Sequence, residues 1–343
     1  MDAIARSAAD RLHQDTVELA SILAAGLGLS PRDQAEADLR CLLDGVAAAV
    51  EFSCTGLVDR HLAWQKVRTR ALGGDVSRLD QVPQLLLQAA AGRLDPAQLG
   101  RLREVLAGAA VFVRFSPDSS DTANGPRLEA DSAAGRLLAA ALRGDRVMAQ
   151  AVLGGADSIV ECLEHTIEPM LREVGRLWQE GLINPANEHL ASAFANEAIV
   201  RLATRMEAPA ADAPLVVLVR SHGDEHSLGQ SFVELYAQAE GLRTRRFVAP
   251  ADLGVAIAML TALQPRALLV SCTTTGQMRR VKELIQAVRC DRQLATIPVL
   301  LGGAVFAGVP QLVTQIGADG GGTSGRLTGQ LLRQMLVPAA ALA

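Results

Sequence analysis

The sequence predicts three parts: an N-terminal helical bundle, a four-helix segment, and a C-terminal doubly wound parallel sheet. In the last third of the chain, apolar runs at 214–219, 267–272 and 297–303 alternate with helical patterns. That alternation predicts parallel strands joined by right-handed crossovers. Earlier residues repeat apolar positions at spacings of three and four, as in 39–50, which indicates helices. Hydrophobic residues make up 49% of the 343 residues, enough for a sizeable core.

Two stretches rich in turn formers, 116–126 and 207–214, divide the chain into parts spanning 1–115, 128–206 and 214–337. In the first part, helices are expected near 3–26, 31–56, 57–72, 82–92 and 96–114. In the second they are expected near 128–143, 145–153, 157–179 and 185–205, the last with Asn184 as N-cap before Pro185. In the third, strands are expected near 214–220, 243–249, 266–272, 297–302 and 317–322, and helices near 228–240, 252–263, 276–289, 307–315 and 324–336.

Composition excludes several classes of protein. The net charge of −4 gives no sign of a nucleic-acid or membrane partner. The start of the chain lacks the basic-then-apolar order of a signal peptide, and no apolar run is long enough to span a bilayer, so a cytoplasmic protein is expected. The five cysteines form no C-x-x-C pair, which favours reduced thiols over a disulfide frame or a zinc site.

The N-terminal bundle resembles no family that we recognise. It contains no helix-turn-helix pattern with a basic recognition helix, so no direct nucleic-acid contact is expected. The cluster Lys66-Val-Arg-Thr-Arg70 is interpreted as a solvated helix face, with a nucleic-acid contact as the alternative. His61 and Trp64 are three residues apart on a predicted helix and can face one another.

The segment Asp224-Glu225-His226-Ser227-Leu228-Gly229 directly follows an apolar strand and opens onto a helical pattern. Open α/β sheets bind their ligands at this end of the strands, so His226 is well placed to coordinate a metal. Asp224 can accept a hydrogen bond from the other ring nitrogen, which would fix the tautomer. Gly229 allows close approach of a bulky cofactor. The alternative is a loop histidine satisfied by its own backbone.

The next strands end in Ser271-Cys-Thr273 and in Gly302-Gly303. D-x-H-x-x-G, then S-x-T, then G-G, each at a strand end, resembles the cobalamin-binding domain family. The resemblance implies that His226 is the lower cobalt ligand in place of the cofactor's dimethylbenzimidazole. It also implies that the nucleotide tail lies in a groove beside the sheet, near Ser271, Thr273 and the glycine pair. Thr273 stands where many members of the family have leucine.

Trp178 is followed after nine residues by Glu188-His189, across a predicted turn between two helices. This spacing resembles the four-helix cap of cobalamin-dependent photoreceptors and regulators, in which the tryptophan packs over the upper axial group near the Glu-His pair. Light-responsive repressors of that group have a histidine directly after the tryptophan, whereas this chain has Gln179. The alternatives are a core tryptophan, a first-turn helix charge and a buried structural histidine.

These motifs together predict a cobalamin-dependent sensor that is not an enzyme. Adenosylcobalamin is the expected cofactor, and loss of its upper ligand in light is the expected signal. The output would be protein contact that regulates transcription, as in the antirepressors that this unit resembles, through a partner or through self-association of the N-terminal bundle. A homo-oligomer is expected. The first alternative is a corrinoid protein that carries methyl groups for a methyltransferase, and the second is a domain that has kept the fold without binding cobalamin.

Overall fold

The computed structural model describes residues 2–29, 33–117, 127–156, 158–322 and 324–336. The chain forms two compact units. One comprises 1–120 with 274–279, and the other comprises 121–273 with 280–343. The second unit therefore holds both the predicted four-helix segment and most of the α/β part.

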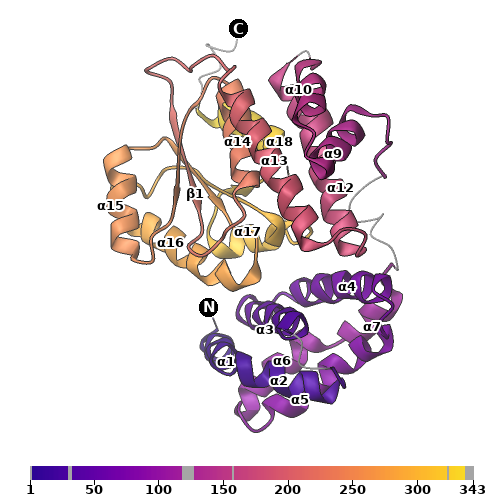
Figure 1. The fold of residues 1–343 in the computed structure, drawn as a ribbon. Helices are drawn as coiled ribbons and strands as arrows, with labels where there is room; N and C mark the ends of the chain where they lie inside the picture. The colour runs from indigo at the N-terminus through magenta and orange to yellow at the C-terminus, as the bar shows by residue number, and fades with distance from the viewer. Residues whose placement is uncertain (1, 30–32, 118–126, 157, 323, 337–343) are drawn as a thin grey trace. The chain divides into compact units, whose positions relative to one another are not determined.

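The N-terminal unit is built from helices, as predicted (Figure 1). Its helices are α1 (Ala3–Gln14), α2 (Thr16–Gly26), α3 (Asp33–Phe52), α4 (Gly56–Ala71), α5 (Val82–Ala90), α6 (Pro96–Leu106) and α7 (Ala109–Phe115), with the 3₁₀ turn η1 (Val76–Gln81) before α5. Among the described residues, no helix combines the length and the apolarity needed to cross a bilayer.

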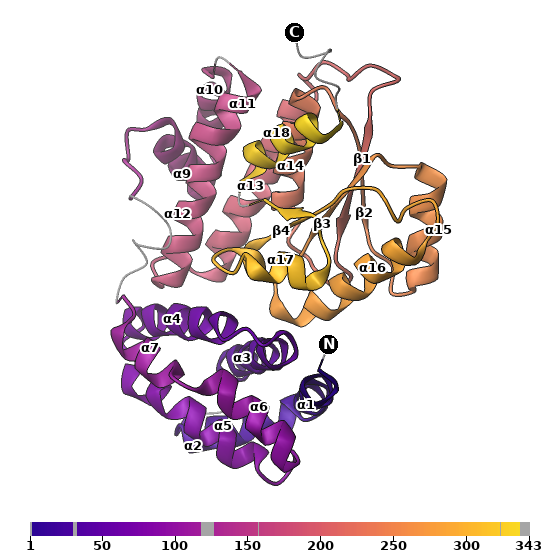
Figure 2. The ribbon, with the colours of Figure 1, turned by 180° about the vertical axis from the view of Figure 1, so that it is seen from behind.

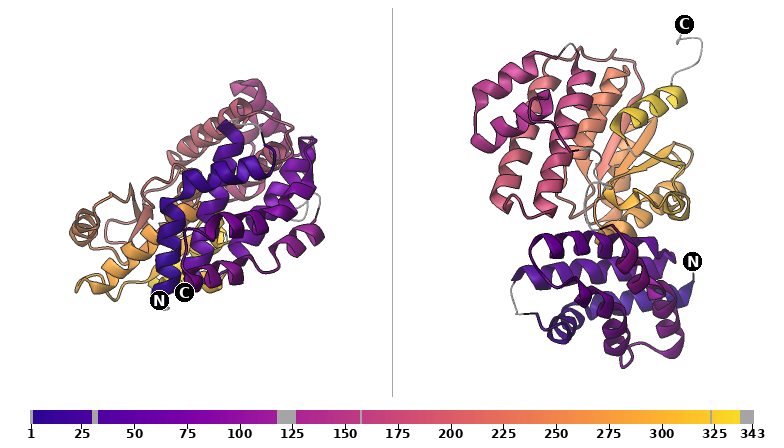
Figure 3. Two further views of the ribbon diagram at one scale, coloured as in Figure 1. Left: turned by 90° about the horizontal axis from the view of Figure 1, so that it is seen from below. Right: turned by 90° about the vertical axis from the view of Figure 1, so that its right-hand side faces the viewer.

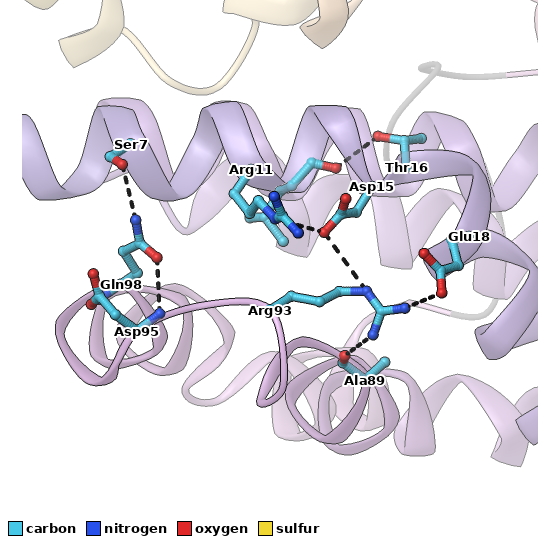
Figure 4. Close-up of polar contacts among 10 residues, drawn as sticks. Ser7, Arg11, Asp15, Thr16, Glu18, Ala89, Arg93, Asp95 and Gln98 are labelled. Carbon is cyan, nitrogen blue, oxygen red and sulfur yellow. Dashed lines mark hydrogen bonds and ion pairs between the residues drawn. The ribbon is translucent and has the colours of Figure 1, made fainter.

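Two of the predicted helices are each divided in two. The helix expected over 96–114 breaks at Gly108, which has a φ of +85° that glycine adopts without strain. The helix expected over 3–26 breaks at Asp15, whose carboxylate lies 3.0 Å from Arg11 Nε and 3.7 Å from Arg93 Nε. Arg93 also pairs with Glu18 and donates to the carbonyl of Ala89, 3.0 Å away (Figure 4). Arg93, which is distant in sequence, thus fills the corner between α1 and α2.

The interpretation of Lys66 as part of a solvated face is wrong. Its side chain is buried, and Nζ donates to the carbonyl oxygens of Ser116 (2.6 Å) and Arg114 (3.3 Å). A lysine ammonium satisfies the last carbonyls of α7, which a helix leaves without partners in its own backbone. The pairing of His61 with Trp64 is confirmed, with ring centroids 6.4 Å apart.

The four-helix segment of the second unit begins later than predicted. Its helices are α9 (Ala133–Arg143), α10 (Arg146–Gly154), α11 (Ile159–Cys162) continuing through the π-helical turn η2 (Leu163–Ile167) into α12 (Glu168–Gln179), and α13 (Pro185–Ala203). Ser132 caps α9, because its Oγ accepts a hydrogen bond from the Gly135 amide at 3.0 Å. Asn184 caps α13 as predicted, accepting from the Asn187 amide at 2.9 Å.

The C-terminal part is a five-stranded, wholly parallel sheet in the order β2-β1-β3-β4-β5. Its strands are β1 (Leu215–Arg220), β2 (Arg243–Val248), β3 (Ala267–Ser271), β4 (Val299–Gly302) and the short β5 (Gly320–Gly321). The intervening helices are α14 (Leu228–Ala239), α15 (Leu253–Leu263), α16 (Met278–Cys290), α17 (Gln311–Ile316) and α18 (Gly325–Leu336). Helices α14 and α18 cover one face, and α15, α16 and α17 the other (Figures 2 and 3). The predicted doubly wound fold is confirmed.

Helix α14 joins the four-helix segment to the sheet. Phe232, Leu235 and Tyr236 belong to the same buried cluster as the inward-facing residues of α9, α12 and α13. The Tyr236 hydroxyl donates to Glu168 Oε1 at 3.0 Å, and burial raises the pKa of both groups. A Cβ on Gly325 would lie 2.7 Å from the Tyr236 ring, so glycine there is what lets α18 approach α14. One tyrosine therefore contacts three helices.

Replacing Tyr236 with phenylalanine should destabilise the protein by about 1–3 kcal/mol, because Glu168 would keep its partly buried carboxyl group without this donor. Denaturant unfolding of the two proteins measures the difference. Glu168→Gln is the matched control, since its amide oxygen can still accept the tyrosine hydrogen bond and should lose less stability. A phenylalanine variant as stable as the parent would mean that the hydroxyl does not stabilise the contact between α14 and α12.

Candidate cofactor-binding site

Asp224 connects the loop after β1 to the loop after β3. Its carboxylate is fully buried, and Oδ1 accepts a hydrogen bond from the backbone amide of His226 at 3.0 Å. The same oxygen lies 2.9 Å from His226 Nδ1, while Oδ2 accepts from the backbone amide of Thr273 at 2.8 Å. Burial raises the pKa of Asp224, but these hydrogen bonds outweigh it and leave the pKa below its usual value. An ionised carboxylate thus fixes both loops.

His226 is held at one ring nitrogen and open at the other. Its hydrogen bond with Asp224 raises its pKa, against the lowering effect of partial burial. The side chain is 64% exposed, and Nε2 has no hydrogen-bond partner among the residues that the structure describes. A neutral imidazole that donates from Nδ1 presents a lone pair at Nε2, which is how metal-ligating histidines are commonly arranged.

The four-helix segment places an acidic group toward this imidazole. Glu188 lies in the first turn of α13, and its negative charge contributes to the raised pKa of His226. Its carboxylate accepts from Ser192 Oγ at 2.6 Å and lies 2.8 Å from His189 Nδ1. Trp178, one residue before the end of α12, is partly buried. Glu188, on the four-helix segment, therefore interacts electrostatically with His226, on the loop after β1.

The residues that follow the tryptophan and the glutamate differ in access. The Gln179 side chain is buried, so it is not open to a ligand. His189, in contrast, has a side chain that is 80% exposed.

The predicted glycines fall into two classes. Gly303 has a φ of +114°, and a Cβ there would lie 2.0 Å from the carbonyl oxygen of Cys272, so the backbone itself requires glycine. Gly229, the second residue of α14, has no atom within 4 Å of the position that a Cβ would take. The protein fold alone therefore does not explain Gly229, whereas a large ligand packed against the start of α14 would.

Two buried hydroxyls at the strand ends have no hydrogen-bond partner among the described residues. One is Ser271 Oγ, at the end of β3 and paired in register with Gly302 of β4. The other is Ser221 Oγ, directly after β1, which the sequence analysis missed because a single serine carries no motif. Thr273 donates its backbone amide to Asp224, and its side-chain hydroxyl also hydrogen bonds to that carboxylate. Unpaired buried hydroxyls are costly, which fits a polar ligand as their partner.

These residues fit a corrin-bound cobalt. The described residues contain no group of three or more His, Cys, Asp or Glu side chains placed to hold a metal ion. A cobalt already held in a macrocycle needs only one axial donor from the protein, which His226 Nε2 can provide. Gly229 leaves space for the ring, and Ser271, Gly302 and Gly303 lie together where the resemblance predicts the nucleotide tail.

In the protein without cofactor, His226 should titrate above its ordinary pKa. Because the folded pKa exceeds the unfolded one, the pair adds stability at low pH that is lost as the pH rises through the folded pKa of His226. Asp224→Asn removes the main cause and should move the titration midpoint down. Histidine NMR resonances followed against pH measure this, with exposed His165 as the internal control. A midpoint that the substitution leaves unchanged would rule out Asp224 as the cause.

Gly229→Ala should separate the needs of the fold from those of the cofactor. Alanine favours the helix by up to about 1 kcal/mol, so the protein without cofactor should be as stable or more stable. Its affinity for cobalamin should fall, because the methyl group occupies the space open to the ring. Denaturant unfolding and absorbance titration measure the two effects. Gly100→Ala, in α6 and equally free of neighbours, should leave the affinity unchanged.

Comparisons with known proteins identify the family of the two C-terminal parts. A curated relative, an uncharacterised 20.5 kDa protein in the bchF–crtJ intergenic region of Rhodobacter capsulatus, is 26% identical over 166 residues, 47% of this chain and 84% of that protein. The solved monomethylamine corrinoid protein of Methanosarcina barkeri is 16% identical, covers 58% of this chain and 95% of its own, and has a TM-score of 0.50, which indicates a shared fold. A cobalamin-binding protein from Desulfitobacterium hafniense DCB-2 is 16% identical over 58% of this chain and 96% of its own, at a TM-score of 0.34. Residues 133–203 and 214–327 each match a family described as B12 binding domain, and the chain therefore belongs to the cobalamin-binding domain family.

Proposed function

We propose that this cobalamin-binding protein is a sensor that responds to light through loss of an adenosyl upper ligand. The observation that carries the proposal is the placement of Glu188 toward His226, with Trp178 at the end of the preceding helix. His226 would hold the cobalt on one side of the ring, and Glu188 and Trp178 would contact the axial group on the other side, of which only the first is needed for binding. The upper face is thus available to distinguish one axial group from another.

When bound, adenosylcobalamin supplies a cobalt–carbon bond that visible light can break. Trp178 offers a flat apolar surface to a large upper group, and the Glu188 carboxylate can accept a hydrogen bond from a ribose hydroxyl or an adenine amine. Each such hydrogen bond is worth on the order of 1 kcal/mol net.

Loss of the upper group would remove its contacts with the four-helix segment. The equilibrium between two arrangements of that segment would then change. Gln179 is buried and an amide is a poor cobalt donor, so the exposed imidazole of His189 is the first candidate for the replacement ligand. The output that we propose is a changed contact with a protein partner or with a second copy, transmitted by this unit and the N-terminal bundle.

The second candidate function is transport of methyl groups for a methyltransferase system. The M. barkeri protein of similar fold is named a monomethylamine corrinoid protein. The hydrogen-bonded pair of Asp224 and His226 would serve this chemistry equally well, because proton uptake by the pair can accompany release of the cobalt. Trp178 favours the sensor over the methyl carrier. Its large indole can pack on an adenosyl group, whereas a methyl group offers it little surface.

The protein loaded with adenosylcobalamin should change its absorption spectrum under green light and, with it, its hydrodynamic size. Absorbance and size-exclusion chromatography with light scattering measure both. Trp178→Ala should weaken binding of adenosylcobalamin more than that of methylcobalamin. Trp64→Ala, at the only other tryptophan, should affect neither. Photolysis with identical size profiles, together with equal affinity for both cofactors, would support the methyl carrier instead.

A further inference from the structure

On the four-helix segment, the facing sides of α10 and α13 enclose a hollow of about 250 Å³ that is open to solvent. We call it the α10–α13 groove. Each wall is a stripe with the spacing i, i+3 or i+4, i+7, which places its members on one helix face. The walls include Arg146, Gln150 and Leu153 on α10, and Phe194, Glu197 and Arg201 on α13. Both helices pack on α9, so the groove runs for about two turns between them.

The groove has an apolar floor. Leu153 is buried and Phe194 partly buried there. Binding pockets for small molecules cover most of the ligand. This hollow is open to solvent, so it is better suited to a few side chains of another protein.

The charges on the groove are unbalanced. Glu197 is shared by Arg201 at 2.7 Å and by Arg146 at 3.5 Å, so two guanidinium groups compete for one carboxylate. Arg143 and Arg205 near the ends of the two walls are also exposed and have no ion pair among the described residues. The carboxylate of Asp145 caps α10, accepting from the Met148 amide at 3.0 Å, and keeps its negative charge. The four arginines still outnumber the two carboxylates, and the excess positive charge favours an acidic occupant.

We infer that the α10–α13 groove binds an acidic amphipathic helix of a partner protein. Its leucine-like side chains would fill the hollow between Leu153 and Phe194, and its carboxylates would pair with Arg146 and Arg201. Such helix-in-groove binding uses anchors at the same spacing as the two walls. A second copy of this chain is the less favoured occupant, because a symmetric contact would bring the arginines of both copies together.

One rigid element connects the groove to the cofactor site. Helix α13 carries Glu188, whose charge acts on His226, in its first turn, and Arg201 about 20 Å further along the same helix. Any shift of α13 at the site therefore also moves one wall of the groove. This link rests on the proposed sensor function and identifies the surface through which that sensor would act.

The test uses the full chain loaded with adenosylcobalamin in the dark. The probe is a fluorescein-labelled peptide of about 18 residues, long enough to be helical, with leucines on one face and glutamates beside them. A peptide with lysines in place of the glutamates is the control probe. The acidic peptide should bind, and the lysine peptide should not.

Two variants address the groove. Arg201→Glu and Arg146→Glu should each weaken binding of the acidic peptide by about tenfold. Arg146 is the first residue of α10, where a glutamate is compatible with the helix, so the fold should survive. Arg103→Glu and Arg6→Glu make the same change at exposed positions of the N-terminal bundle and should have no effect.

Equal binding of both peptides, no binding of either, or unchanged affinity in the groove variants would each overturn the inference. Dissociation of an oligomer by the groove variants, without peptide binding, would assign the groove to a second copy instead. The same titration after green light separates this inference from the proposed function. Peptide binding that persists unchanged after demonstrated photolysis keeps the groove as a binding site but removes it from the light response.

Discussion

The cofactor-binding edge of this protein depends on one buried carboxylate. Asp224 accepts hydrogen bonds from His226 and Thr273 on two loops, and without them burial would favour its neutral form. Because β1 lies between β2 and β3, Asp224 stands where the chain connections leave in opposite directions, the usual ligand position in open α/β sheets. The orientation of the His226 ring and the position of Thr273 both follow from this group.

Sequence patterns predicted those features whose stabilising contacts lie between residues close together in the chain. Alternation of apolar runs and helical stretches gave the strand positions, and Asn184 before Pro185 gave the start of α13, because an N-cap bond spans only three residues. His226 and Asp224 could be paired from spacing alone for the same reason. The resemblance supplied the identity of the cofactor, which no spacing reveals.

The features that sequence reasoning missed depend on distant groups. Arg93, from the turn between α5 and α6, pairs with Asp15 at the corner between α1 and α2, and Lys66 is buried against the end of α7. Thr273 contacts Asp224 through both its backbone amide and its side chain, from a loop 49 residues further along the chain. The glycine that admits α18 to α14 is recognisable only once Tyr236 is seen beside it. None of these features can be predicted until the tertiary fold shows which distant residues lie together.

The joint between the four-helix segment and the sheet has a consequence for how the protein can be observed. Tyr236 is the only tyrosine in the chain, and its ring sits where α12, α14 and α18 meet. Its phenol absorption therefore originates from a single place, and its wavelength depends on whether the hydroxyl is bonded to a carboxylate or to water. Tyrosine absorption can therefore report separation of the four-helix segment from the sheet without any added label.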